Sequence, residues 1–288
     1  MQVLSCANTT PAYGATGSVP VLNVAIGETF CIETNDRFEM MPGGGQPDPE
    51  IVRALIGPVH VEGIAAGDTL AIEIVDITPR TDCGYLLASS RFGLLGDQVA
   101  TRAKVIPIRG DQVFLTDQTT IRYAPMIGKI GVAPDRPEPG TATGAFGGAL
   151  SCIQIAPGAT LYVKAARDGA GVCLEDVHAA MGDGEATASA VEMAARVTLR
   201  CTRYEGPVLP LPALTNADEL VVFAKGDTAD VAARAATDAL LEALMTHRDI
   251  DLTEAALIVG AAGDVRISFI GSTPVQARAA IARHLSGI

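Results

Sequence analysis

Two side chains able to bind a metal stand two positions apart in the second half of the chain, Asp176 and His178. In an extended strand, residues two apart point to the same face, so the carboxylate and the imidazole should lie side by side. The preceding residues of that face, Val172 and Leu174, are apolar, and an unpaired carboxylate is costly to bury. We therefore expect Asp176 to pair with a donor or to share a bound cation with His178.

A glycine-rich turn follows at once and carries two more carboxylates, Asp183 and Glu185. The glycines on either side of Asp183 tolerate positive φ, so the turn can bring both carboxylates back toward the end of the strand. A set of Asp, His and Glu is a plausible ligand combination for zinc or a similar divalent metal that keeps a water in an open position. The pattern predicts Asp176, His178 and Glu185 as metal ligands, with Glu185 or Asp183 as the catalytic base.

Two other interpretations of these residues stay open on the pattern alone. The turn can be an ordinary hairpin, with His178 a satisfied strand histidine and Asp176 a local hydrogen-bonding residue. A cysteine nucleophile is the second, since Cys152 and Cys173 flank the turn in sequence. Cys173 alternates onto the opposite face from Asp176, however, and no activating pattern accompanies Cys152, so we expect both to be buried structural thiols.

The run 176–185, Asp-Val-His-Ala-Ala-Met-Gly-Asp-Gly-Glu, resembles the signature of the acetamidase/formamidase family. Further segments resemble that family in the same order along the chain, at 57–63 with 67–70, 125–134, 158–163 and 263–267. The resemblance implies a hydrolase that cleaves the C–N bond of small linear amides such as formamide and acetamide, releasing carboxylate and ammonia. It also implies metal assistance, with zinc as the expected metal.

The resemblance places the four residues of the 176–185 run at the active centre and suggests three less secure contributors. Asp36 and Glu62 come from earlier strands, but Asp36 can simply stabilise a turn and Glu62 can be a solvated strand residue. His60 stands where relatives often carry an aromatic residue, so it is either a compensating ligand or a structural histidine.

One segment departs from the family pattern. Where relatives tend to have Gly-Asn-Met-Asp, residues 148–151 are Gly-Ala-Leu-Ser, so an amide is missing at Ala149 and a carboxylate at Ser151. Three consequences stay open: a different metal geometry, a different amide substrate such as a cyclic or larger one, or a catalytically degenerate protein that only binds a ligand.

The composition limits the partners. The 288 residues carry a formal net charge of −12, a surface that repels nucleic acid and anionic lipid but accepts a small neutral substrate. No basic leader with an apolar run and no stretch of about 18 apolar residues occurs, which predicts a cytoplasmic protein without a membrane partner. The six cysteines are scattered, as expected for reduced, mostly buried thiols.

A repeated Gly-x-Thr turn organises the elements that must position these residues. It precedes expected strands at 30–34, 70–77 and 161–164, and further strands are expected at 57–62, 103–108, 170–178 and 185–203. Segment 79–150 lacks helix signals and is expected to form loops over the β-core.

The last third has the periodicity of helices instead. A helix is expected from Asp227 or Thr228 to about His247, a shorter one capped by Thr253, a strand at 264–270, and a terminal helix from Thr273-Pro274 through His284. On that terminal helix, the basic residues would form a solvated face; they are Arg278, Arg283 and His284.

These expectations together give an α+β fold with a β-rich sandwich or barrel-like front and helices concentrated in the C-terminal third. Residues 1–205 would form the β-rich core with the candidate site, and residues 206–288 an α+β part packed on it as one continuous globular unit. Because a β-rich front tends to expose strand edges, a homo-oligomer is expected.

Overall fold

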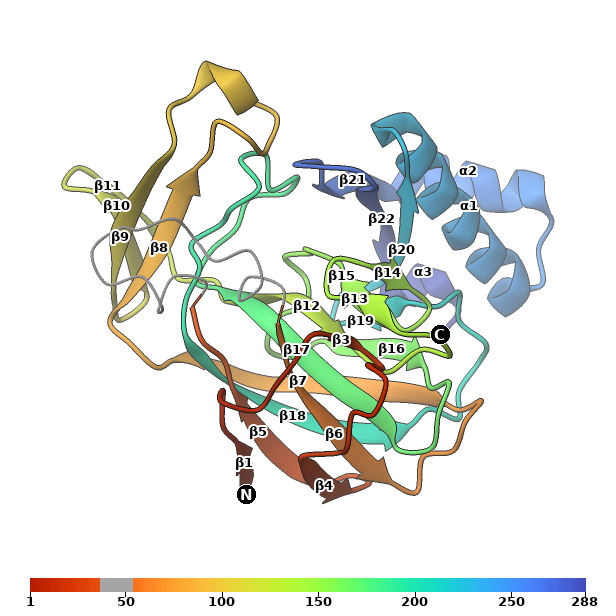
Figure 1. Cartoon of the computed structure of the whole chain (residues 1–288). Coiled ribbons are helices and arrows are strands. Elements are labelled where there is room, and N and C mark those ends of the chain that lie inside the picture. Colours follow the sequence, from red (N-terminus) through yellow and green to blue (C-terminus); the bar gives the residue numbers. More distant parts are fainter. Residues whose placement is uncertain (37–53) are drawn as a thin grey trace.

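The computed structural model describes residues 1–36 and 54–288, and most of its strands belong to two large sheets (Figure 1). The first sheet has nine strands, in the order β1 (Gln2–Leu4), β5 (Thr29–Glu33), β18 (Ala195–Arg203), β7 (Thr69–Pro79), β16 (Thr160–Lys164), β19 (Ala213–Thr215), β20 (Glu219–Gly226), β22 (Val275–Ala282) and β21 (Asp264–Phe269). The second has seven strands, in the order β14 (Thr143–Gly144), β15 (Gly147–Ala149), β12 (Met126–Gly131), β17 (Ala170–His178), β6 (Leu55–Glu62) and β2 (Thr9–Thr10), with β4 (Leu22–Ala25) pairing with β6 in addition.

The two sheets share one hydrophobic core. Ile72 and Leu199 contribute to it from the nine-stranded sheet, and Val59 and Leu174 from the seven-stranded sheet. Apolar side chains of both sheets thus fill the space between them, as in a sandwich. The Gly-x-Thr units are confirmed as strands β5, β7 and β16, and the α+β, β-rich fold class is confirmed as well.

Helices cover the part of the nine-stranded sheet that the C-terminal strands β20 and β22 form (Figure 1). Helix α1 (Ala229–Arg248) begins after Thr228, whose side chain accepts a hydrogen bond from Val231 N, and it packs against β20 and β22. Helix α2 (Leu252–Ala262) and the short α3 (Arg283–Ser286) complete this layer. A second hydrophobic core lies between α1 and the sheet. The expected helix after residue 227 is therefore confirmed.

The structure corrects three expected elements. The terminal helix is wrong, because residues 275–282 form strand β22 between β20 and β21, and only residues 283–286 are helical. Alanine-rich sequence favours a helix, but the small side chains here let a strand pack closely under α1, and tertiary pairing overrides the local preference. Strand β18 starts at Ala195 rather than at 185, and Asp251, not Thr253, caps α2.

Segment 79–150 contains more strands than expected. Four of them form an antiparallel sheet, called the arm here: β8 (Cys83–Ala88), β9 (Arg102–Arg109), β10 (Gln112–Thr116) and β11 (Thr119–Arg122). The arm stands away from the body, with a 3₁₀ turn at Gly96–Gln98 near its tip (Figure 1). A small pair, β3 (Ala12–Tyr13) with β13 (Glu138–Pro139), forms a separate two-stranded sheet.

The cysteines and the helices bear on two other expectations. All six cysteines are free, and four of them are buried, as expected for structural thiols. Within residues 1–36 and 54–288, no helix combines the length and apolar character needed to cross a membrane.

Candidate active site

The site is built at the end of β17, where the strand departs from regular geometry. Asp176 has φ +67°, in the left-handed region that aspartate tolerates better than most non-glycine residues. Its neighbour across the ladder is Gly128 of β12, flanked by the register pairs of residues 127 and 129. A Cβ on Gly128 would come within 2.8 Å of Asp176 Oδ2, so the glycine leaves the space that the carboxylate occupies. Backbone strain of this kind accumulates at functional sites.

Three buried side chains converge there: Asp176, His178 and Glu192. His178 Nε2 lies 3.1 Å from Glu192 Oε2 and 3.5 Å from Asp176 Oδ1. One ligand atom from each residue falls within 4.8 Å of the others. Oxygen and imidazole nitrogen atoms so arranged match the donor set of a zinc-type site.

The His178 side chain lies in an environment that could hold a cation. Its ring is fully buried, and neither ring nitrogen has a hydrogen-bond partner with acceptable geometry in the part of the chain that the structure describes. Buried polar atoms normally have such a partner, and the ligand atoms of the three residues lie close enough together to share one cation. We call Asp176, His178 and Glu192 the metal-ligand group.

The charge of the group acts on the imidazole. Burial by itself lowers the pKa of His178, but the carboxylates of Glu192 and Asp176 oppose this effect, and the resulting pKa is raised well above the ordinary value. Without a metal, the imidazole therefore holds a proton between two carboxylates.

Two further side chains hold the carboxylates of the metal-ligand group. Lys129 of β12 is buried, and its Nζ lies 3.3 Å from Asp176 Oδ2. The Ser189 hydroxyl donates to Glu192 Oε1 at 3.5 Å. Contacts of this kind fix the orientation of metal ligands.

The position of Glu192 depends on the arm as well as on the body. Its backbone N–H and C=O bond to Tyr85 of β8, each at 2.8 Å, and it also forms a β-bridge with His178. Gly84 allows this contact, because a Cβ there would lie 2.5 Å from Glu192 O. Glu192 thus joins β8 to the end of β17.

Sequence reasoning missed Glu192 and Lys129 as site residues. Each is a lone charged residue in an otherwise apolar stretch, Lys129 in 126–133 and Glu192 in 188–195. A single charged residue in a segment that must be buried requires a partner. This pattern in the sequence could have marked both Lys129 and Glu192 as candidate site residues.

The two carboxylates of the turn, Asp183 and Glu185, have different surroundings. Asp183 accepts hydrogen bonds from Arg278 and forms an ion pair with Arg266, at 3.0 Å and 3.3 Å. Glu185 is buried, with φ +40°, and it is not a member of the metal-ligand group.

The structure does not bring His60 and Glu62 to the group. His60 pairs with Ala170, at the opposite end of β17 from His178, and its ring packs where a Cβ on Gly169 would be. Glu62 lies two residues further on β6 and is exposed. Asp36 is buried just after β5 and contributes to the charge around Cys83 in the arm.

The cysteines near the turn do not have the properties of nucleophiles. Burial raises the pKa of Cys152 to about 11 and that of Cys173 to about 12. Thiolates are the reactive species, so both residues stay inert at neutral pH. Ser151, at the departure from the family pattern, is buried with φ +41°, and its N–H bonds to Gly128 O beside Asp176.

Comparison with known proteins supports the resemblance read from residues 176–185. The model of the Acetamidase/Formamidase family matches residues 19–140 and 139–209. The chain belongs to this family. It is an amidase, a hydrolase of non-peptide C–N bonds.

Solved structures extend the match over the whole amidase. The acetamidase from Bacillus halodurans is 34% identical, with a TM-score of 0.94, over 99% of this chain and 100% of that one. A predicted acetamidase/formamidase from Thermoanaerobacter tengcongensis is 28% identical, with a TM-score of 0.92, over 99% and 96%. A gamma lactamase from Delftia acidovorans, 19% identical with a TM-score of 0.63 over 98% and 90%, shares the fold. No curated protein matches the chain.

Proposed function

We propose that this amidase hydrolyses small linear amides, such as formamide or acetamide, with a divalent metal held by Asp176, His178 and Glu192. The observation that supports the proposal is the buried metal-ligand group, in which one ligand atom from each residue lies within 4.8 Å of the others. Family membership and similarity to an acetamidase over the full chain support the substrate class.

Zinc is the metal we propose. One imidazole and two carboxylates would hold the ion, and catalytic zinc is commonly bound by three such protein ligands with a further position for water or substrate. Glu192 thus takes the ligand position that the sequence suggested for Glu185. When bound, the metal polarises the amide carbonyl and lowers the pKa of water toward about 7.

Amide hydrolysis also needs a proton carrier, since the amine is a poor leaving group. We assign this role to Glu185, which accepts the proton of the attacking water and returns it to the leaving nitrogen. Its buried carboxylate belongs to the turn that follows the metal-ligand strand. Asp183, the sequence's alternative, has both oxygens engaged by guanidinium groups.

Lys129 and Ser189 have supporting roles in the proposal. The Lys129 ammonium compensates the charge of Asp176 and fixes one of its oxygens, and Ser189 fixes Glu192 in the same way. Each leaves the other carboxylate oxygen directed toward His178.

The test is metal content of the purified amidase together with ammonia release from formamide and acetamide. We expect near-stoichiometric zinc and ammonia release in the wild type, loss of both in His178→Ala, and loss of release with retained zinc in Glu185→Gln. The exposed His284 provides a matched control, and His284→Ala should behave as the wild type.

The outcomes separate the alternatives. Zinc without ammonia release from either compound points to another amide, cyclic or larger. A protein without metal and without activity would be the catalytically degenerate, ligand-binding protein that the departures at Ala149 and Ser151 suggest. Full activity in His178→Ala contradicts the proposed metal site.

We also propose that the amidase is a homo-oligomer. The arm presents exposed apolar residues near its tip, Phe92, Leu94 and Leu95. Apolar patches on a protruding element are typical of interfaces. Light scattering of the wild type and of Leu94→Asp tests this, and a wild-type monomer contradicts it.

A further inference from the structure

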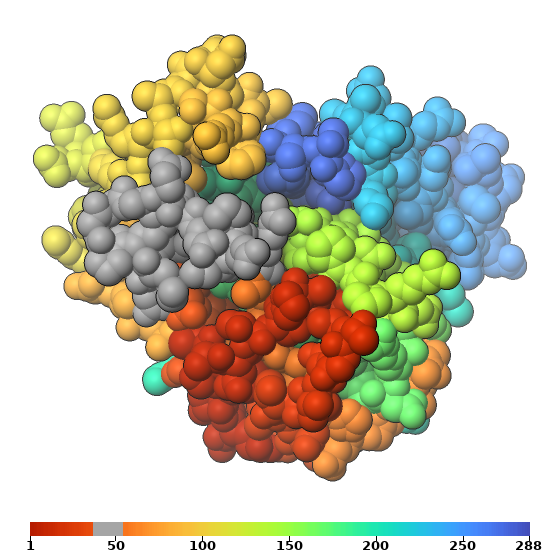
Figure 2. All heavy atoms as spheres, in the orientation of Figure 1, coloured from red at the N-terminus to blue at the C-terminus, as the bar shows by residue number. Residues whose placement is uncertain are grey.

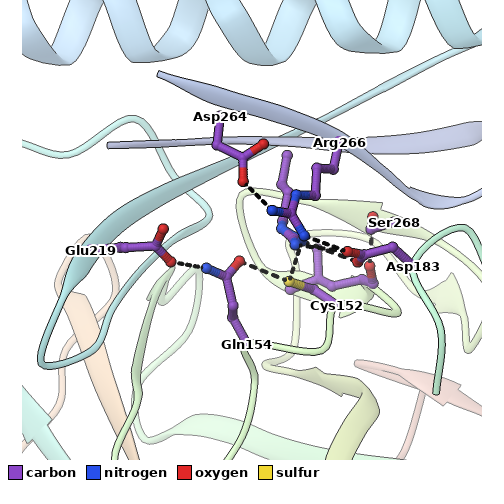
Figure 3. Close-up of polar contacts among 9 residues, drawn as sticks. Cys152, Gln154, Asp183, Glu219, Asp264, Arg266 and Ser268 are labelled. Carbon is purple, nitrogen blue, oxygen red and sulfur yellow. Dashed lines mark hydrogen bonds and ion pairs between the residues drawn. The ribbon is translucent and has the colours of Figure 1, made fainter. Parts of the chain in front are cut away.

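A partly buried ion pair joins the turn of residues 182–185 to the distant strand β22. Arg278 Nη1 donates to Asp183 Oδ1 at 3.2 Å, and Nη2 donates to Oδ2 at 3.0 Å. Arg278 is 3% exposed, whereas the second guanidinium on Asp183, that of Arg266, belongs to a half-exposed side chain. Figure 3 shows Asp183 beside Arg266, with Cys152 and Ser268 close by. A two-pronged contact of this kind fixes the carboxylate in orientation as well as position.

Arg278 is buried on the face of β22 that it shares with Ala280, a residue of the main hydrophobic core. Neighbours on the alternate face, such as Ala277 and Ala279, fill the core under α1, while Ala280 belongs to the main core. Burying a guanidinium on the main-core face costs desolvation free energy, and an apolar pair of similar size often stabilises a protein equally well. The location of Arg278 therefore suggests a role beyond stability.

The loop that contains the turn is held from two sides. The hairpin of β21 and β22 contacts it on one side, where Ile270 N donates to Gly184 O at 2.9 Å. The segment of the arm that follows β8 contacts the loop on the other side, where Leu94 N donates to Ala186 O at 2.7 Å. Arm and hairpin meet directly through Gly93 N and Gly271 O, and Figure 2 shows the dark-blue hairpin against the yellow arm.

The same hairpin reaches the metal-ligand group by a second route. The Ser268 hydroxyl donates to Leu150 O at 3.2 Å, and Arg278 Nη1 lies 4.0 Å from Cys152 Sγ. The N–H groups of Leu150 and Ser151 both donate to Gly128 O, and Gly128 faces the Asp176 carboxylate. Arg278 thus touches both segments that border the site.

We propose that Arg278 is a positioning residue of the active site, which fixes the 182–185 turn through Asp183 and so sets the position of Glu185. Asp183 serves as an anchor for the turn rather than as a proton carrier. The inference deepens the proposed function and rests on it for the role of Glu185. The anchoring of the turn itself is independent of any metal.

The experiment compares three variants of the full-length amidase. Arg278→Lys keeps the charge but removes the fork, Asp183→Asn keeps the shape but removes the charge, and Arg266→Gln is the matched control, because it removes the exposed partner of the same carboxylate. Hydrogen exchange measures the protection of the Glu185 and Ala188 amides, which bond within the turn. Zinc content, kcat, KM and the pH profile of kcat are measured alongside.

We expect Arg278→Lys and Asp183→Asn to lose protection in segment 182–188 and to lower kcat by a similar factor, about 10- to 100-fold, as for other contacts that orient a site. KM, zinc content and the shape of the pH profile should stay near wild type, and the double variant should be no worse than either single one. Arg266→Gln should resemble the wild type.

Two results would overturn the inference. Unchanged protection of segment 182–188 in both Arg278→Lys and Asp183→Asn would show that the pair does not hold the turn. A loss in Asp183→Asn far larger than in Arg278→Lys, with a missing limb in the pH profile, would make Asp183 the proton carrier. A wild type without zinc or without ammonia release contradicts the proposed function instead, and the exchange measurement still decides the anchoring.

Discussion

The carboxylate of Asp176 occupies space that exists only because residue 128 has no side chain beyond hydrogen. A Cβ at that position would lie 2.8 Å from Asp176 Oδ2 and 2.9 Å from its backbone oxygen, too close for either atom to remain in place. Lys129, the next residue, contacts the same carboxylate. The position of one proposed metal ligand is therefore set by two neighbouring residues of β12.

We predict that Gly128→Ala lowers zinc content and kcat/KM together, by about 10- to 100-fold, because the ligand must move. Gly260→Ala is the control: this glycine lies in α2, has open space around the new Cβ and a backbone without positive φ, so the change should be tolerated. Zinc analysis and ammonia release measure both variants. Wild-type zinc content in Gly128→Ala would contradict the close contact.

At this scale the sequence predicted two of the three buried residues that converge at the end of β17. Asp176 and His178 were predictable, because strand alternation places residues two apart on one side. Glu192 was not, because its approach to His178 needs a chain reversal after residue 185 and a bridge to Tyr85. Asp183 was assigned chemistry that its contact with Arg278 does not favour.

Helix starts in the C-terminal third depend on single capping residues. The Thr228 hydroxyl accepts from Val231 N at the start of α1, and the Asp251 carboxylate accepts from Glu254 N at the start of α2. Thr253, which the sequence suggested as a cap, lies inside α2. Each cap satisfies an N–H group that otherwise lacks a partner within the helix.

Removing a cap should therefore destabilise the protein, whereas removing Thr253 should not. We predict a loss of about 1 kcal/mol in the free energy of unfolding for Thr228→Ala and for Asp251→Ala. Thr253→Ala serves as the control, with a change within about 0.5 kcal/mol. Chemical denaturation followed by circular dichroism measures all three. A larger loss in Thr253→Ala than in Asp251→Ala would reverse the assignment.

Elements with strong local signals were predictable, and those fixed by partners were not. The Gly-x-Thr turns predict β5, β7 and β16, because the turn residues and the alternation of apolar and polar side chains are both local features of the sequence. Residues 275–282 read as a helix because alanine and arginine favour one, but pairing with β20 and β21 makes them a strand. Because these residues form a strand, Arg278 is buried in the core and does not lie on the solvent-exposed helix face that the sequence predicted.

For the molecule as a whole, His178 links the stability of the β-core to pH, and the proposed metal would add a second link. The pKa of His178 is raised in the folded state, where Glu192 and Asp176 outweigh burial. In the metal-free protein, its proton contributes stability that is fully present below the ordinary histidine pKa and is lost as the pH rises through the raised value. A metal must displace that proton in order to bind.

We therefore predict that zinc stabilises the amidase more at about pH 8 than at about pH 6, by up to about 1.4 kcal/mol per pH unit for one proton released. Thermal unfolding with and without saturating zinc, after chelation, measures the difference at each pH. His178→Ala is the control and should lose the zinc effect. Equal stabilisation at both pH values would contradict proton displacement from His178.

The sequence by itself determined the family signature at 176–185, the β-rich front, the helix after Thr228 and the existence of a second helix close behind it, and it placed Asp176 and His178 on one face of a strand. These features depend on neighbours within a few positions, which turn chemistry and periodicity describe. Tertiary structure decided that Glu192 completes the metal-ligand group, that Lys129 faces Asp176, and that Arg278 holds Asp183. Such contacts join residues distant in sequence, and only the packing of the arm, the two sheets and the C-terminal hairpin brings them together.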